Sequence, residues 1–135
     1  MRKHLLIIDD HDPDLLYARI VAERAGIAQR VTTIEDARDA LALLRQPEGS
    51  DVDLILLDIN MPGLDGFGFL QAFEALFNGD KGKAPVVVML TSSPDPADRK
   101  RAFSFASVRD YVVKPVSVAA IIELAKRLDA ADART

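Results

Sequence analysis

Four apolar runs in the sequence end in side chains that could take part in one chemical step. The carboxylates Asp9 and Asp10 follow the first of these runs, Asp58 follows another, and two later runs end in Thr91 and Lys114. If the carboxylates met, each like-charged pair about 4 Å apart would cost roughly 4 kcal/mol at an effective dielectric near 20. Such a cluster must retain a proton or hold a cation, and hard oxygen ligands with room for water and a phosphate favour Mg²⁺.

A carboxylate beside a divalent cation predicts the chemistry of an acyl phosphate. Asp58 would be the nucleophile toward a phosphoryl group, Lys114 and the metal ion would neutralise the phosphoryl oxygens, and Thr91 would donate its hydroxyl proton to one of them. Phosphorylation would take the aspartate from one negative charge to about two and add acceptor oxygens. The pattern therefore indicates the input of a switch.

The residues around these side chains predict five β-strands separated by amphipathic segments. The strands are expected at residues 5–8, 29–33, 52–57, 85–90 and 111–113. The central runs are continuously apolar, as in parallel strands that are covered on both faces. Helical spacing or charge pattern predicts helices within residues 34–44, 67–77, 97–105 and 118–128.

The first helix has the clearest end signals. Asp12 is expected to cap it, Pro13 to occupy its first turn and Gly26 to end it. A polar turn is expected at Asn78–Lys83, between the third helix and the fourth strand.

Five strand-then-helix units predict an α/β fold, with a doubly wound, parallel five-stranded sheet in the order 2-1-3-4-5. In such sheets ligands bind outside the carboxyl ends of the strands. The first strand then lies beside the third, so that Asp10 and Asp58 share one crevice and Asp9 lies at its edge. One domain is expected over residues 1–135, with a core at about 3–129 and a polar tail at about 130–135.

Composition excludes several other classes of protein. The chain has 135 residues, 49% of them hydrophobic, a formal net charge of −4 and no cysteine. The absence of cysteine rules out disulfide frameworks and thiolate chemistry, and the acidic balance makes nucleic acid an improbable partner. The apolar run at residues 5–8 is too short for a signal peptide or a membrane span. The expected location is cytoplasmic.

Four sequence segments together resemble the receiver domain of two-component response regulators, the CheY-like family. They are Asp9-Asp10, Leu56–Gly66, Thr91-Ser92 and Tyr111–Pro115, in that order along the chain. The resemblance covers essentially the whole chain and implies a stand-alone receiver of the flavodoxin/CheY-like fold. It implies a switch rather than a classical enzyme, one that assists its own aspartyl phosphorylation and autodephosphorylation.

The resemblance also implies residue roles. Asp58 would be the phospho-acceptor, and Mg²⁺, or Mn²⁺ as a substitute, would be held by Asp58, Asp9, Asp10 and the backbone carbonyl of Asn60. Thr91 and Lys114 would respond to phosphorylation, and Tyr111 would be an aromatic switch that turns inward behind Thr91. Asn60 and Ser93 would tune dephosphorylation, and a cis bond is implied before Pro115.

The implied partners are a sensor histidine kinase or phosphotransfer protein as donor and a downstream protein as target. The target would contact the fourth helix, the fifth strand and the last helix. Residues 95–102 resemble receivers that serve bacteriophytochrome-type kinases. Messenger, phosphorelay shuttle and phosphate sink remain alternatives, and a homodimer is open; no nucleic acid or membrane contact is expected.

Two other classes of protein share part of this pattern. Phosphatases of the haloacid dehalogenase type also use an aspartate nucleophile with Mg²⁺, but they need a second aspartate at the position of Asn60 as general acid. A flavodoxin-like nucleotide or flavin binder would need a glycine-rich phosphate loop after the first strand, which the sequence lacks. His4 and His11 are interpreted as structural or solvent-facing, not as phosphoryl carriers or metal ligands.

Overall fold

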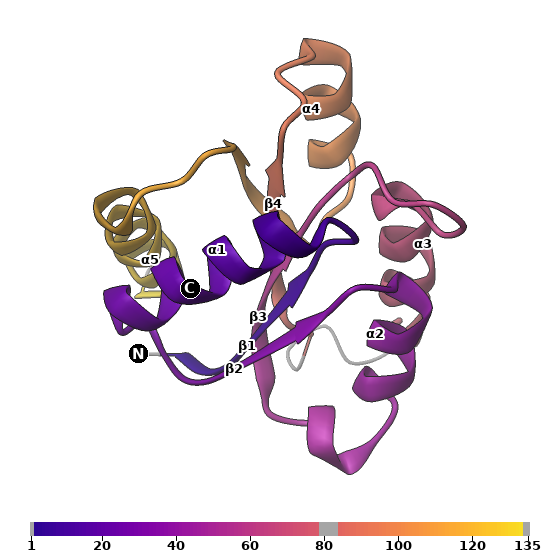
Figure 1. Cartoon of the computed structure of the whole chain (residues 1–135). Helices are drawn as coiled ribbons and strands as arrows, with labels where there is room; N and C mark the ends of the chain where they lie inside the picture. The colour runs from indigo at the N-terminus through magenta and orange to yellow at the C-terminus, as the bar shows by residue number, and fades with distance from the viewer. Residues whose placement is uncertain (1, 79–83, 134–135) are drawn as a thin grey trace.

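The sheet consists of five parallel strands. A computed structural model describes residues 2–78 and 84–133, and its strand order β2-β1-β3-β4-β5 confirms the predicted topology (Figure 1). The strands are β1 (Arg2–Ile8), β2 (Ala28–Ile34), β3 (Val52–Leu57), β4 (Val86–Thr91) and β5 (Val108–Val113).

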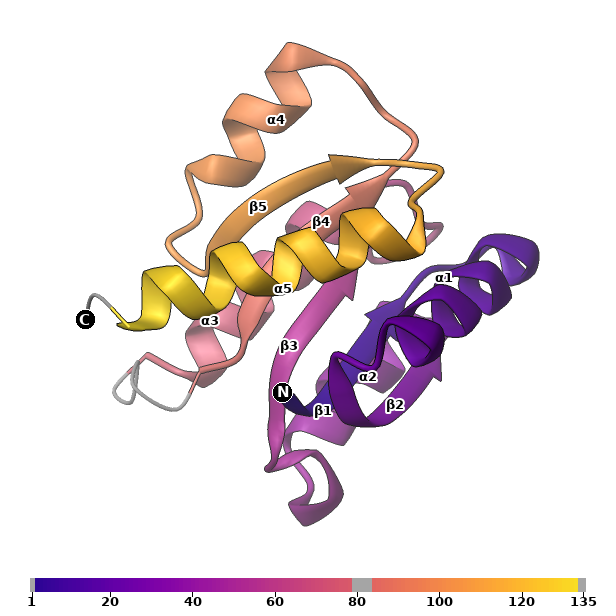
Figure 2. The same cartoon turned by 90° about the vertical axis from the view of Figure 1, so that its left-hand side faces the viewer.

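Helices cover both faces of this sheet. They are α1 (Asp12–Ala25), α2 (Ala37–Leu44), α3 (Gly66–Leu76), α4 (Pro96–Phe103) and α5 (Val118–Ala133), with a short 3₁₀ turn at Pro47–Gly49. Helices α1 and α5 lie next to each other on one face, with α2 and α3 on the other (Figures 1 and 2). Within the described residues, no helix combines the length and apolar character needed to cross a membrane.

The core is split by the sheet into two clusters. Because successive strand residues point to opposite faces, Leu5 and Ile7 of β1 pack in the cluster under α1 and α5, whereas Leu6 and Ile8 pack in the cluster of α2 and α3. All four side chains are at most 2% exposed. The central strands are therefore buried on both faces, which explains their continuous apolar sequence.

The strand predictions were best at the centre of the sheet. β3 has the predicted bounds, but β1 and β5 begin earlier than expected, at Arg2 and Val108. β1 includes a polar residue, His4, that is buried with hydrogen-bonded partners, and β5 is an edge strand whose first half is partly exposed. Neither segment has the apolar run that the sequence pattern required.

The expected cap of the first helix was wrong. Asp12 is the first helical residue, and His11 is the N-cap without a side-chain capping bond. The backbone N–H of His11 instead donates to Oδ1 of Asp9 at 3.0 Å. The predicted end was confirmed: Gly26 closes α1 in the left-handed conformation, with φ of 64°.

Other helix boundaries shift by a few residues. Ile34 is the last residue of β2 and not part of the second helix. Helix α2 begins at Ala37, because Asp36 caps it by accepting from the N–H of Arg38. Asp95 likewise caps α4. Helix α5 continues to Ala133, through the first part of the segment 130–135 expected as a polar tail. Of the expected turn at Asn78–Lys83, residues 79–83 lie outside the described residues.

Two backbone features shape the carboxyl end of the sheet. The Lys114–Pro115 peptide bond is cis, as the resemblance implied. Gly66 begins α3 directly behind the end of β3, and its N–H donates to the carbonyl oxygen of Ile59 at 2.8 Å. A Cβ atom at Gly66 would lie 2.5 Å from the Asp58 carbonyl oxygen, so only glycine allows this close approach.

Candidate functional site

Three carboxylates converge at the carboxyl ends of β1 and β3. Ile8 and Leu57 are register partners in this parallel pair, so the residues that follow them emerge side by side. One oxygen from each of Asp9, Asp10 and Asp58 lies within 4.8 Å of the other two. Asp9 and Asp58 are buried and Asp10 is exposed. The predicted meeting of these distant residues is confirmed.

Asp58 is held in place by the backbone around it. Its N–H donates to the Ile8 carbonyl oxygen at 3.0 Å, and its Oδ1 accepts from the N–H of Ile59 at 2.9 Å. Burial raises the pKa of the Asp58 carboxyl above its usual value; Lys114 opposes this increase and the negative charge of Asp9 adds to it. An additional positive charge beside Asp58 would favour its ionised form, as Lys114 does.

Lys114 brings a positive charge to the cluster from the end of β5. Its ammonium group donates to Asp9 and, at 3.0 Å, to Oδ2 of Asp14, while its Nζ lies 3.9 Å from Oδ1 of Asp58. Burial alone would lower the pKa of Lys114, but the bonds to Asp9 and Asp14 and the attraction of Asp58 outweigh it, and the pKa is raised. Lys114 therefore remains protonated and positively charged at neutral pH.

Thr91 completes the inner part of the site from the end of β4. Its side chain is fully buried, and hydrogen bonding from Thr91 favours the ionised form of Asp58. Its Oγ1 also accepts from the N–H of Ser93 at 3.3 Å. Ser93 is half-buried and donates its hydroxyl proton to Asp98 of α4 at 2.7 Å, which links the loop after β4 to that helix.

Tyr111 lies inward, behind this loop. The side chain is buried, and its hydroxyl donates to the backbone carbonyl oxygen of Ser93 at 2.7 Å. The guanidinium carbon of Arg99 lies 5.6 Å from the centre of the Tyr111 ring and 5.2 Å from that of Phe103. This arrangement satisfies the distance for cation–π attraction and joins α4 to β5.

The donor set fits a hard divalent cation. Three carboxylates that approach within 4.8 Å repel each other, and oxygen ligands on one side of a partly open edge suit Mg²⁺, which keeps several waters. Asn60, whose carbonyl was expected to contribute, is exposed in the loop directly after Asp58 and Ile59. Asp10 is the solvent-exposed member of the cluster.

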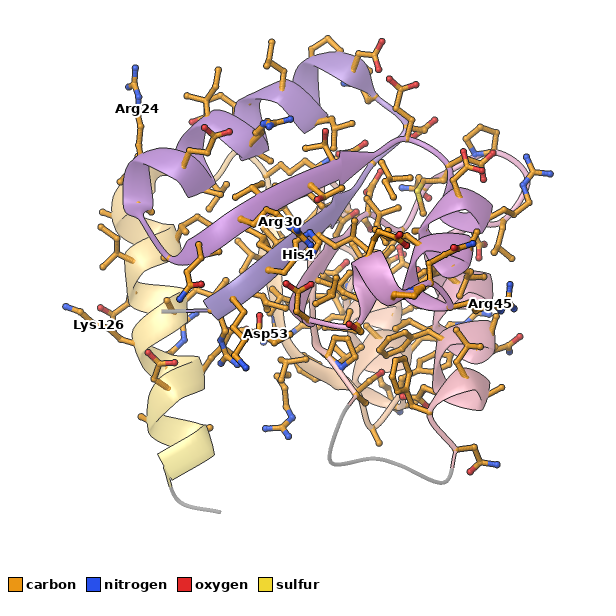
Figure 3. The ribbon with its side chains drawn as sticks, turned by 90° about the horizontal axis from the view of Figure 1, so that it is seen from below. His4, Arg24, Arg30, Arg45, Asp53 and Lys126 are labelled. Carbon is orange, nitrogen blue, oxygen red and sulfur yellow. The ribbon has the colours of Figure 1, made fainter. Side chains whose placement is uncertain are left out.

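The two histidines lie outside this cluster, as expected. His11 is exposed, whereas His4 is 1% exposed, near the start of β1 and thus toward the opposite end of the strand. Its Nδ1 lies 2.8 Å from Asp51 Oδ1 and its Nε2 lies 2.6 Å from the Thr32 hydroxyl. Figure 3 shows His4 beside Arg30 of β2, whose guanidinium is 2.9 Å from the His4 ring. His4 is therefore a structural residue.

Two residues of the site were not identified from the sequence. Asp14 contacts Lys114 from α1, and Arg99 contacts Tyr111 from α4. An acidic residue in the first turn of a helix and a basic residue on an exposed helix are both ordinary. Asp14 lies 100 residues before Lys114 in the sequence, and Arg99 lies in the helix before the strand of Tyr111, so no local pattern marked either contact.

A parallel five-stranded sheet with three carboxylates, a buried threonine and a lysine at its carboxyl edge is the arrangement of a receiver domain. The model of the response regulator receiver domain family matches residues 5–126, and the chain belongs to this family. Receiver domains are signalling switches of two-component systems; they accept phosphate from histidine kinases and bind Mg²⁺ through an acidic pocket.

Individual relatives support this assignment. The chain is 33% identical to the protein PilH of Pseudomonas aeruginosa over 83% of its own length and 85% of PilH. A two-component response regulator from Cytophaga hutchinsonii superimposes with a TM-score of 0.77 and 25% identity, covering 94% of the chain and 98% of that structure. The bacteriophytochrome response regulator AtBRR has a TM-score of 0.75 and 28% identity, with 94% and 91% covered.

Other curated relatives are longer than this chain. It spans 44% of the probable transcriptional regulator ycf27 of Cyanophora paradoxa and 47% of ResD of Bacillus subtilis.

Proposed function

We propose that this protein is a phospho-accepting receiver in which Asp58 takes a phosphoryl group from a histidine kinase or a phosphotransfer protein. The observation that carries the proposal is the convergence of Asp9, Asp10 and Asp58 within 4.8 Å, with the ammonium group of Lys114 beside them. A nucleophile, a cation site and a fixed positive charge then share one edge of the sheet.

The proposed step is an in-line displacement at phosphorus. An oxygen of Asp58 forms the new bond to phosphorus, while the bond to the donor's histidine nitrogen breaks and that nitrogen keeps the electron pair. Lys114 neutralises charge on the phosphoryl oxygens, and Thr91 donates its hydroxyl proton to one of them. Mg²⁺, held by Asp9, Asp10, Asp58 and the Asn60 carbonyl, would supply further neutralisation of the phosphoryl charge; Mn²⁺ is expected to replace it.

Phosphorylation is proposed to act on the loop after β4. The modified Asp58 attracts Thr91, and movement of Thr91 changes the backbone around Ser93, to which the Tyr111 hydroxyl is bound. The affected surface is that of α4, β5 and α5, where Phe103, Val113 and Ile122 are 37–43% exposed. The proposed output is contact of this surface with a protein target, with no role for nucleic acid or membrane.

The side chains of Asn60 and Ser93 are proposed to tune hydrolysis of the aspartyl phosphate. Asn60 is exposed two residues after Asp58, and Ser93 is half-buried two residues after Thr91. Each lies two residues after a residue that is proposed to contact the phosphoryl group, and from there its side chain is proposed to influence access of water to the phosphorus atom. Their size and polarity would therefore set the lifetime of the signal.

The donor proposed for this chain is a bacteriophytochrome-type histidine kinase. Support comes from the resemblance to AtBRR and to a second bacteriophytochrome response regulator, RtBRR, which is 29% identical with a TM-score of 0.72. A panel of purified kinases and phosphotransfer proteins tests this choice through the rate at which each labels the chain. Fast return of phosphate to a phosphotransfer protein would identify a shuttle or a sink instead of a messenger.

Acetyl phosphate provides the direct test of the acceptor. With Mg²⁺ present, intact-mass measurement should show addition of one phosphoryl group to the parent protein and none to Asp58→Asn. A chelator should abolish the addition. Labelling that persists in Asp58→Asn, or that is equal with chelator, would reject Asp58 as the acceptor.

A further inference from the structure

We infer that Asp14 is a positioning residue that holds Lys114 back from Asp58 until phosphoryl transfer, an inference that rests on the proposed function. Asp14 lies in the first turn of α1, and Lys114 follows β5. The contact joins two elements that meet only in the folded protein. This contact determines where the ammonium group of Lys114 lies before it binds the phosphoryl oxygens.

Both carboxylate oxygens of Asp14 have a partner. Oδ2 accepts from Nζ of Lys114 at 3.0 Å, and Oδ1 lies 3.2 Å from Nδ1 of His11. The hydrogen bond from Lys114 is the main reason why the pKa of Asp14 is lowered. The carboxylate is therefore ionised and oriented toward Lys114 at neutral pH.

In the resting protein the ammonium group of Lys114 is bonded to Asp9 and Asp14 and not to Asp58. Its ammonium group has three N–H donors, of which Asp9 and Asp14 each accept one. The distance of 3.9 Å from Nζ to Oδ1 of Asp58 is too long for a hydrogen bond. Attraction of the ammonium group toward phosphoryl oxygens on Asp58 would lengthen its bond to Asp14.

A contact that exists before the reaction and is weakened in the transition state slows the reaction. The side chain of Asp14 is 40% exposed and that of Lys114 is 14% exposed, so water screens the pair in part. For an ion pair of this kind, loss of the Asp14 charge should accelerate phosphorylation by about twofold to fivefold.

Three variants separate this effect from a general change of charge. Asp14→Asn removes the acceptor charge, and Asp14→Glu restores a carboxylate that can reach Lys114. Asp12→Asn removes the same charge from the same helical turn, and the described residues contain no ion pair between Asp12 and Lys114. The rate of labelling by acetyl phosphate with saturating Mg²⁺ is measured for each variant and for the parent protein.

Asp14→Asn is expected to be labelled about twofold to fivefold faster than the parent, with Asp14→Glu and Asp12→Asn close to the parent rate. A second measurement, without metal or phosphodonor, records the NMR signal of the Lys114 ammonium group. This signal should shift in Asp14→Asn, remain in place in Asp12→Asn, and return toward its parental position in Asp14→Glu.

The inference is overturned if Asp14→Asn is no faster than Asp12→Asn, if the glutamate variant behaves like the asparagine variant, or if the ammonium signal does not respond to Asp14→Asn. Failure of the proposed function has a different signature, because labelling then persists in Asp58→Asn. If Asp58→Asn is not labelled, as the proposed function requires, and Asp14→Asn is labelled at the parent rate, only the positioning role of Asp14 is rejected.

Discussion

The hydroxyl group of Tyr111 donates to the backbone carbonyl oxygen of Ser93 at 2.7 Å, and thereby ties β5 to the loop after β4. Ser93 itself donates from its backbone N–H to Thr91 and from its hydroxyl to Asp98. The guanidinium group of Arg99 lies over the Tyr111 ring. The threonine that faces Asp58 is therefore connected to α4 and β5 by a short, continuous set of contacts.

Loss of the Tyr111 hydroxyl should loosen this connection. In Tyr111→Phe the ring can keep its buried position, but the bond to Ser93 is lost, and the free energy of unfolding should fall by about 1 kcal/mol. Urea midpoints of the two proteins measure the change. Tyr17→Phe, which removes the hydroxyl of an exposed tyrosine on α1, is the matched control and should leave the midpoint unchanged. Equal midpoints for Tyr111→Phe and the parent would count against the contact.

Neutralising Asp58 should stabilise the metal-free fold. Its pKa is raised in the folded protein, chiefly by burial, so the folded state binds this proton more tightly than the unfolded chain does. Stability is therefore lost as the pH rises above 3.8 and through the pKa of the folded state. In chelator at pH 7, Asp58→Asn should be more stable than the parent by up to about 1 kcal/mol.

The pH dependence of the difference between the parent and Asp58→Asn provides an internal control for that prediction. As the pH falls toward 3.8, Asp58 becomes protonated in the folded parent, and the difference between the two urea midpoints should shrink. A difference that does not depend on pH would indicate a packing effect of asparagine. A midpoint no higher than that of the parent at pH 7 would contradict a clustered carboxylate site.

Binding of Mg²⁺ should be visible as stabilisation. A ligand that binds only the folded state at 100 times its Kd adds about 2.7 kcal/mol to the free energy of unfolding. Addition of Mg²⁺ or Mn²⁺ to the chelator-treated parent should raise the urea midpoint, and Asp10→Asn should largely abolish this increase because it removes an exposed ligand of the cluster. Asp12→Asn should respond like the parent. An undiminished response of Asp10→Asn would exclude Asp10 as a ligand.

Burial explains which parts of the fold were predictable from the sequence. β3 is apolar at all but one of its positions and buried between two layers, so its bounds were predicted correctly. The start of β1 was missed because His4 is buried through hydrogen bonds to Asp51 and Thr32 that only the folded chain provides. Asp12 resembles a helix cap locally, but α1 begins at Asp12, one residue earlier than predicted. The residue before it, His11, donates its N–H to the Asp9 carboxylate, a contact that the local sequence does not reveal.

The residues of the candidate site were also predictable only in part. Asp9, Asp10, Asp58, Thr91 and Lys114 each follow an apolar run, so strand topology alone predicts where they meet. Their proposed roles come from the family resemblance. Asp14 and Arg99 have no such marker, since neither follows an apolar run and each contacts a residue of another element. Side-chain contacts across elements were therefore the part of the site that the sequence could not reveal.

Two glycines at the start of α3, Gly66 and Gly68, differ in what an added Cβ atom would meet. A Cβ atom at Gly66 would lie 2.5 Å from the carbonyl oxygen of Asp58 and 2.8 Å from the Cα atom of Ile59, both backbone atoms. Gly66→Ala should therefore displace the Asp58 backbone, lower the free energy of unfolding by about 1–3 kcal/mol and slow labelling by acetyl phosphate.

Gly68→Ala is the matched control for this substitution. Its Cβ atom would meet Cδ1 of Leu64 at 2.7 Å, and the end of that flexible side chain can move aside. Alanine also favours the helix over glycine by up to about 1 kcal/mol, so the two effects should nearly cancel. Urea midpoints and labelling rates of both variants are compared with the parent. If Gly66→Ala matched Gly68→Ala in both measurements, contact between α3 and the end of β3 could not be what positions Asp58.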